Sequence, residues 1–156
     1  MIDDRTISHL IVHATLTAPS EEFSFDRMVA NHYERGVRTS NPESRSGYHF
    51  IIQRDGSLIT GRRMSEPARL SGALNESAVA VCLVGGLSES GEHFPSFTGA
   101  QVKSLGKIYD ELRELYPDLV ALGHRDVAAK GKPRVCPCFD VQTWAVFHEE
   151  VQNDSE

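Results

Sequence analysis

Two histidines at the ends of apolar segments are the residues whose type and position best suit chemistry in this sequence. His13 closes the run SHLIVHA, and His124 follows Gly123 in LVALGH. Both runs are typical of buried strands, and strand ends in α/β sheets are where ligands and catalytic groups gather, because a rigid scaffold holds the loops there. Taken singly, each histidine is more typical of a structural residue than of a ligand.

A closely spaced cysteine pair changes that interpretation. In RVCPCFD, one proline separates Cys136 from Cys138. A disulfide within the pair would be strained, and a zinc ribbon would need a second close Cys or His pair, which the sequence lacks. Imidazole nitrogen and thiolate sulfur are common zinc ligands, and a catalytic site uses three protein ligands with the fourth position open to water. His13, His124 and one cysteine of the pair form such a set, and spacing does not decide which cysteine it is.

The third cysteine and the composition predict an ordinary globular protein. Cys82 lies in the apolar run AVCLV and is interpreted as a small buried hydrophobic residue. Three cysteines are too few and odd in number for a disulfide framework, so reduced thiols are expected. With 156 residues and no linker, repeat or apolar run of about 18 residues, the chain is expected to be one domain without a membrane span.

The net charge and the N-terminal residues indicate which partners and which cellular location to expect. The net charge of −6 argues against broad electrostatic binding to nucleic acid, which needs a basic excess. The start, MIDDRTISHLIVHA, has acidic residues where a secretory signal has basic ones. We therefore expect synthesis in the cytoplasm without a signal peptide, and a monomer.

The pattern of elements predicts an α/β (α+β) fold in which a central mixed sheet is flanked by helices. Strands are expected at 8–14, 77–86 and 119–123, and a hairpin at 47–62 in which Asp55-Gly56 favours a type I′ turn. The first helix is expected after Ser24 as N-cap, with Gly36 at its end.

Two further helices are expected in the second half of the chain. Thr98 and Gln101 form a capping-box pattern that opens a helix closed by Pro117. Its apolar stripe is Val102, Leu105, Ile108, Leu112 and Leu115. The last helix is expected to start at Asp140 as N-cap and to carry Val141, Trp144, Val146 and Phe147 as its apolar residues.

Five segments in this order carry a family resemblance: IVHATLTAP, GYHFIIQRDG, VAVCLVGG, LGHRDVA and CPCFD. They resemble the type 2 N-acetylmuramoyl-L-alanine amidases, whose zinc fold is shared by small phage lysozymes and peptidoglycan recognition proteins. The resemblance runs from about Ile7 to Phe147, and it is closest to single-domain phage lysozymes of the amidase kind. It implies one amidase domain over residues 1–156, with its core at about 7–147.

The resemblance implies a role for particular residues. The family's metal ligands fall on His13, His124 and Cys136, which leaves Cys138 in a non-ligand position. The family's catalytic tyrosine falls on Tyr48. Its catalytic lysine falls on Arg134, a departure, because arginine can stabilise an oxyanion but does not readily exchange a proton. Lys132, or Lys130 beside it, is the alternative source of that cation.

The implied activity is hydrolysis of the amide between N-acetylmuramic acid and L-alanine in peptidoglycan by one Zn²⁺, as in a phage or prophage endolysin that reaches the cell wall after release. Three other functions stay open, and one of them is zinc-dependent hydrolysis of another amide, which only substrate assays exclude. The same fold also serves non-catalytic peptidoglycan binders, which often lack the third metal ligand. Some small phage lysozymes also bind and inhibit their phage's RNA polymerase, a trait that depends on surface residues that one sequence does not identify.

Overall fold

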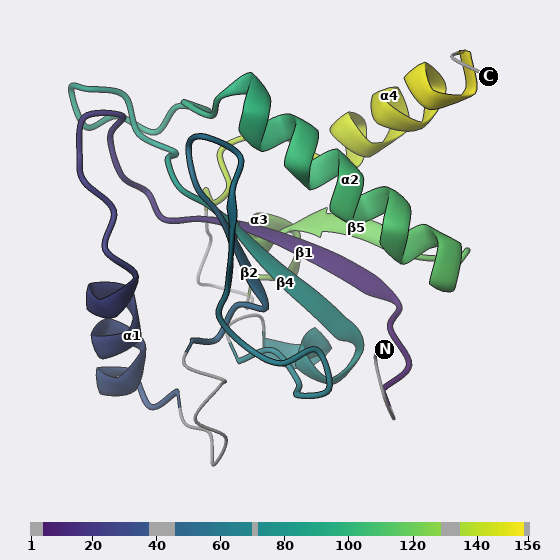
Figure 1. The fold of residues 1–156 in the computed structure, drawn as a ribbon, viewed down its shortest axis with the longest axis horizontal. Coiled ribbons are helices and arrows are strands. Elements are labelled where there is room, and N and C mark those ends of the chain that lie inside the picture. The colour runs from purple at the N-terminus through teal and green to yellow at the C-terminus, as the bar shows by residue number, and fades with distance from the viewer. Residues whose placement is uncertain (1–4, 38–45, 70–71, 129–134, 155–156) are drawn as a thin grey trace.

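A five-stranded mixed sheet forms the centre of the computed structural model, which describes residues 5–37, 46–69, 72–128 and 135–154 (Figure 1). Its strand order is β3-β2-β4-β1-β5. Only β3 runs antiparallel to its neighbour. The strands are β1 (His9–Ala14), β2 (Phe50–Ile52), β3 (Leu58–Thr60), β4 (Ala78–Leu83) and β5 (Val120–Gly123). The predicted fold class is confirmed, and the predicted strands lie where expected.

The sheet buries both of its faces, which explains why β1 and β4 are almost continuously apolar. Helices α2 (Gly99–Leu115) and α4 (Val141–Asp154) pack on one face, where Leu10 and Val12 of β1 contribute to the larger core cluster. Helix α1 (Phe25–Glu34) covers part of the other face (Figure 1). Side chains alternate along a strand, so the neighbours of Val12, including His13, point to this second face.

Short helices complete the fold. The 3₁₀ helix η1 (Gly72–Ser77) leads into β4, and α3 (His124–Val127) follows β5 directly. No described helix is long and apolar enough to cross a membrane.

The predicted helix caps are confirmed. The Ser24 hydroxyl accepts a hydrogen bond from Arg27 N–H at the start of α1, and Gly36 after its end has a φ of +92°. Thr98 and Gln101 make both hydrogen bonds of a capping box on α2. The Asp140 carboxylate accepts a hydrogen bond from Thr143 N–H at 3.2 Å and so caps α4.

The turn between β2 and β3 differs from the prediction. A type I′ turn needs a positive φ at both central residues, but only Gly56 has one, at +88°. Gly56 N–H donates to Gln53 O at 2.8 Å, and Gln53 N–H donates to Ser57 O at 2.8 Å, which encloses a three-residue loop. The Asp55 carboxylate accepts a hydrogen bond from Ser57 N–H at 2.9 Å and stabilises this longer loop.

The apolar stripes of the two large helices are shorter than expected. On α2, the stripe is buried at its centre, whereas Val102 and Leu115 are 41% and 64% exposed. On α4, Val141 and Ala145 are buried, but Val146 and Phe147 are 53% and 62% exposed. Helix α4 projects past the sheet in Figure 1, and its neighbouring residues His148 and Glu149 contact α2, so Val146 and Phe147 lie on the side of α4 that faces away from α2.

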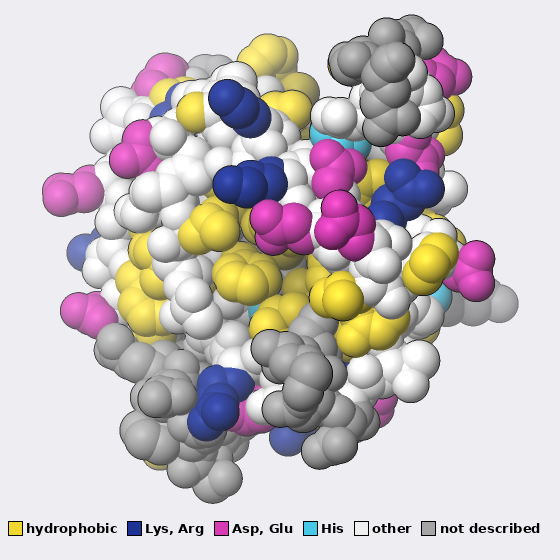
Figure 2. All heavy atoms as spheres, turned by 45° about the vertical axis from the view of Figure 1, so that its right-hand side comes forward, with side chains coloured by type: hydrophobic (Ala, Val, Ile, Leu, Met, Phe, Trp, Pro, Cys, Tyr) yellow, Lys and Arg dark blue, Asp and Glu magenta, His cyan; other side chains and the backbone are white. Residues whose placement is uncertain are grey.

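One face of the surface shows how charge is distributed. Apolar side chains gather near the middle of the face in Figure 2, with acidic and basic groups around them. Acidic and basic side chains are mixed on this face, so the net charge of −6 does not form one large negative patch there.

Candidate metal centre and catalytic site

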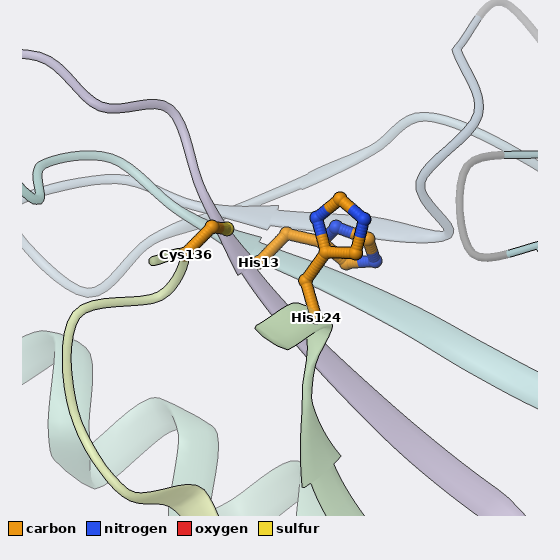
Figure 3. A group of neighbouring side chains, drawn as sticks. All are labelled: His13, His124 and Cys136. Carbon is orange, nitrogen blue, oxygen red and sulfur yellow. The ribbon is translucent and has the colours of Figure 1, made fainter. Parts of the chain in front are cut away.

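Strand register brings the two predicted histidine ligands together. Val12 of β1 pairs with Gly123 of β5 in parallel register, so the residues that follow them, His13 and His124, are neighbours across the two strands. Their ring centroids lie 4.6 Å apart. Cys136 reaches them from the segment before α4, and the three side chains project into a common space (Figure 3). One donor atom from each of the three lies within 4.8 Å of the others.

His13 shows the clearest sign of a missing partner. Its side chain is 1% exposed, and its Nε2 atom has no hydrogen-bond partner among the described residues. A buried polar atom without a partner is costly, so such atoms are rare unless a ligand satisfies them. Burial lowers the pKa of His13 well below 6.5, and the nearby His124 and His32 lower it further. The imidazole is therefore neutral, which is the form that binds metals.

Cys136 is held in place by two backbone groups. Its sulfur accepts a hydrogen bond from Ala14 N–H at 2.9 Å, directly after His13, and Arg125 N–H donates to its carbonyl at 2.8 Å. The side chain is 5% exposed, and burial raises the pKa of its thiol to about 12. In this setting, a cation that replaced the proton would be needed to keep the sulfur ionised at neutral pH.

Cys138 points elsewhere. It has a φ of +75°, and its thiol donates to Gly86 O at 3.3 Å. It does not belong to the group of donors formed by His13, His124 and Cys136. This geometry distinguishes two cysteines that spacing alone could not.

The donor set fits zinc better than a hard cation. Two imidazoles and one thiolate are soft or borderline donors, and no carboxylate belongs to the group. The donor atoms lie within 4.8 Å of one another, so the group is a candidate metal-binding triad.

Tyr48 lies against this triad. It is buried, and its ring centroid is 4.9 Å from that of His13 and 5.1 Å from that of His32. Burial raises the pKa of the Tyr48 hydroxyl well above 10, with further contributions from Cys82 and Cys136. The hydroxyl therefore keeps its proton at neutral pH and can act as a donor. The predicted cationic residues Arg134 and Lys132, like Lys130, lie outside the described residues.

Two residues at this site had no role in the prediction. His32 of α1 has no role in the sequence analysis, yet it is 4% exposed and its Nδ1 accepts a hydrogen bond from Gly47 N–H at 3.2 Å. Cys82 was interpreted as a buried hydrophobic residue, which its exposed fraction of 0% fits, but it is also the partner of His13 in the pairing of β1 with β4. Only the strand order, which the sequence does not state, places these two residues side by side.

Comparisons with known proteins identify the family of this chain. Residues 3–139 match the family model described as N-acetylmuramoyl-L-alanine amidase. The chain is 35% identical over 147 residues to an endolysin of Enterobacteria phage K11, which covers 94% of this chain and 91% of that protein. It is 33% identical over 145 residues to an endolysin of Escherichia phage T7, and the match covers 93% of this chain and 89% of that protein.

Solved structures share the fold at lower identity. The N-acetylmuramoyl-L-alanine amidase LysC from Clostridium intestinale superposes with a TM-score of 0.72 at 20% identity, over 95% of this chain and 87% of that one. Drosophila PGRP-LB gives a TM-score of 0.64 at 20% identity, and the match covers 92% of this chain and 80% of that one. The match to the family model and the relatives above 30% identity lead to one conclusion: the chain belongs to the N-acetylmuramoyl-L-alanine amidase family and is an enzyme of that class, similar to phage endolysins.

Proposed function

We propose that this enzyme is a zinc-dependent endolysin that hydrolyses the amide between N-acetylmuramic acid and L-alanine in peptidoglycan. The observation that carries the zinc assignment is the buried Nε2 of His13. This atom has no hydrogen-bond partner in the part of the chain that the structure describes, and donor atoms of His124 and Cys136 lie within 4.8 Å of the His13 ligand atom. When bound by these three residues, zinc would supply a Lewis acid that polarises the scissile carbonyl and lowers the pKa of water to about 7.

The chain's own groups prepare the donors for that task. The rigid ends of β1 and β5 hold His13 and His124 side by side, and burial keeps His13 neutral. The N–H of Ala14 orients the sulfur of Cys136. Groups that hydrogen-bond to a metal ligand typically fix its geometry, and removing them typically lowers metal affinity or activity.

Tyr48 is the proposed hydrogen-bond donor to the reacting carbonyl. Its hydroxyl remains protonated because the residue is buried, so it can donate to the oxygen on which negative charge develops. A donor that is already in place costs no reorganisation at the moment of reaction, and removing such a donor typically slows turnover ~10²–10³-fold.

A cationic side chain is proposed to stabilise the same oxygen. The family resemblance assigns this role to Arg134, with Lys132 as the alternative. We expect Arg134→Ala to lower kcat by at least tenfold with little change in zinc content, while Lys132→Ala stays near wild type. The opposite pattern would transfer the role to Lys132, and two fully active variants would remove the cation from the mechanism.

A non-catalytic peptidoglycan-binding role is the other function that the fold supports. The presence of Cys136 beside both histidines favours the enzyme, because a pure binder has no need of a complete donor set. We also propose a single domain over 1–156 that acts as a monomer on the cell wall. No observation among the described residues favours binding to a phage RNA polymerase.

Digestion of purified peptidoglycan tests the proposal directly. We expect new amino groups on L-alanine by mass spectrometry, lost with a chelator and restored by added zinc. Cys136→Ser should lose the bound zinc and the activity, whereas the matched variant Cys138→Ser should keep about one zinc per chain. New reducing sugar ends would refute the amidase reaction, and full zinc content in Cys136→Ser would refute the ligand assignment.

A further inference from the structure

Two residues near the proposed metal ligands have an unusual backbone conformation. Within the described parts of the chain, Leu16 and Cys138 are the residues other than glycine with a positive φ, at +57° and +75°. Residues with a side chain disfavour this region and keep it only where the surrounding structure requires it. Leu16 follows His13 by three residues, and Cys138 follows Cys136 by two. Each of the two segments that supply these donors is therefore constrained just beyond its donor.

Both constrained segments meet at Gly86, three residues after the end of β4. Gly86 is buried and has a φ of +103°. A Cβ added at Gly86 would lie 3.1 Å from Cδ2 of Leu16 and 3.2 Å from Cβ of Ala14. The thiol of Cys138 donates a hydrogen bond to the Gly86 carbonyl at 3.3 Å. Gly86 thus lies against one donor-bearing segment with its Cα and binds the other through its carbonyl.

Gly86 itself has a fixed place in the structure. It forms a parallel bridge with Thr17, which continues the pairing of β1 with β4 beyond the ends of both strands. Its N–H donates to the Ser96 hydroxyl at 3.1 Å, and its carbonyl also accepts a hydrogen bond from Phe94 N–H at 3.1 Å. These contacts hold Gly86 from both neighbouring loops, so the donor-bearing segments pack against a rigid point.

Ala14 connects this packing to the donors themselves. It directly follows His13 in β1, and its N–H donates to the Cys136 sulfur at 2.9 Å. If Ala14 moved away from Gly86, the backbone of His13 and the sulfur of Cys136 would shift relative to each other. Such shifts matter for metal binding, because a site needs its groups within about 0.5 Å of the working geometry.

We propose that Gly86 is a positioning residue that sets the separation of the His13 and Cys136 donors. Its bare Cα lets the segment after His13 pack closely, and its carbonyl holds the segment after Cys136. The inference rests on the proposed function, since it concerns the donors assigned to zinc. It adds the residues after β4 to a site that otherwise draws on β1, α3, the residues before β2 and the segment before α4.

Zinc affinity, measured by competition with a chelator of known affinity, tests the role of the bare Cα. In Gly86→Ala, we expect the dissociation constant for zinc to rise at least about tenfold, the usual effect of disturbing the groups around a metal ligand. Gly91→Ala is the matched control. Gly91 lies in the same connection between β4 and α2 and has a φ of +85°, but a Cβ there would meet no described atom within 4 Å.

Both glycine variants place a side chain at a positive φ, so both should lose stability, which urea unfolding of chelator-treated protein measures. Only Gly86→Ala should also lose zinc affinity, whereas Gly91→Ala should stay within about twofold of wild type. Equal zinc affinities in the two variants, whether weakened or unchanged, would overturn the proposal, because the contacts of Gly86 would then have no effect of their own.

A second pair of variants adds no volume to the core and applies even where Gly86→Ala does not fold. Cys138→Ala removes the thiol that donates to the Gly86 carbonyl, whereas Cys138→Ser keeps a donor there. A thiol is a weak donor, so we expect zinc to bind about threefold more weakly in Cys138→Ala, with Cys138→Ser closer to wild type. Equal zinc affinity in wild type and Cys138→Ala would overturn the role of the carbonyl.

Hydrogen exchange at the Ala14 amide reports the geometry without metal or substrate. In chelator-treated wild type, the Cys136 sulfur accepts a hydrogen bond from this N–H, so we expect NMR to show slow exchange. Relative to the other amides of β1, Ala14 should exchange faster in Gly86→Ala and at the wild-type rate in Gly91→Ala. The same relative rate in all three proteins would contradict the proposed link from Gly86 through Ala14.

The inference and the proposed function fail in different ways. Wild-type protein that binds no zinc would refute the proposed function and the positioning role with it. Zinc binding and amidase activity in wild type, together with equal zinc affinities in Gly86→Ala and Gly91→Ala, would overturn the positioning role alone and leave the proposed function intact.

Discussion

At the scale of single residues, His49 shows how a buried polar side chain can connect strands. It is 0% exposed, its Nδ1 accepts a hydrogen bond from Ala80 N–H at 3.0 Å, and its Nε2 lies 2.8 Å from Glu66 O. A ring that accepts at Nδ1 must carry its proton on Nε2 and donate it to Glu66 O. Burial, together with the nearby Arg5 and Arg62, lowers the pKa of His49 to about 4, against the opposing effect of the hydrogen bond to Glu66 O.

This lowered pKa predicts that stability depends on pH. Between the unfolded value near 6.5 and the folded value of about 4, the unfolded chain binds more protons, so the free energy of unfolding falls as pH falls through this window. A full shift corresponds to about 3 kcal/mol. His32, whose pKa burial also lowers to about 4, acts in the same direction.

Urea unfolding of chelator-treated protein from pH 7 to pH 4.5 measures this dependence. Wild type should lose stability steadily, and His49→Asn, whose side-chain oxygen can accept from Ala80 N–H, should show a shallower slope. An equal slope in both proteins would remove His49 as a source of the pH dependence.

At the scale of elements, Gln101 connects a helix start to the ends of two strands. Its side-chain oxygen accepts a hydrogen bond from Thr98 N–H at 2.9 Å. Its amide group donates to Ile52 O at 3.0 Å and to Val84 O at 2.8 Å. The capping box was predictable because it is a local pattern, but the bonds to the carbonyls depend on where β2 and β4 end in space.

Gln101→Ala is expected to lower the free energy of unfolding by about 2–3 kcal/mol, because it removes part of the cap and leaves two buried carbonyls without this donor. Chemical denaturation measures the change. Lys103→Ala, an exposed substitution two residues along the same helix, is the control and should stay within about 0.5 kcal/mol of wild type. Similar losses in both variants would show that α2 responds to general changes in helix propensity.

Other features of the elements could not be predicted, because they too depend on how the elements lie relative to one another in space. The alternating and helical periods correctly placed strands and helices, since local sequence determines them. The exposure of Val146 and Phe147 depends on which side of α4 faces α2, where His148 and Glu149 make the contacts, and their own spacing does not encode this. The turn at Gly56 depends on the side chain of Asp55 and its hydrogen bond to Ser57.

At the scale of the whole molecule, the site exists because of strand order. Placing β1 between β4 and β5 brings His13 beside Cys82 on one side and next to His124 on the other. The sequence identified the histidines by their positions at strand ends, but the choice of Cys136 over Cys138 came from the family resemblance. In space, that choice follows from which sulfur faces Ala14 and which faces Gly86.

The contact between Ala14 and Cys136 also sets an order of events during synthesis. It joins groups 122 positions apart, so the ribosome delivers His13 long before the third donor. A nascent chain can hold its first strand long before it can hold a complete donor set. A product interrupted between β5 and Cys136 would thus carry all five strands but not the centre proposed for cutting the cell wall, which ties catalytic competence to synthesis of the segment before α4.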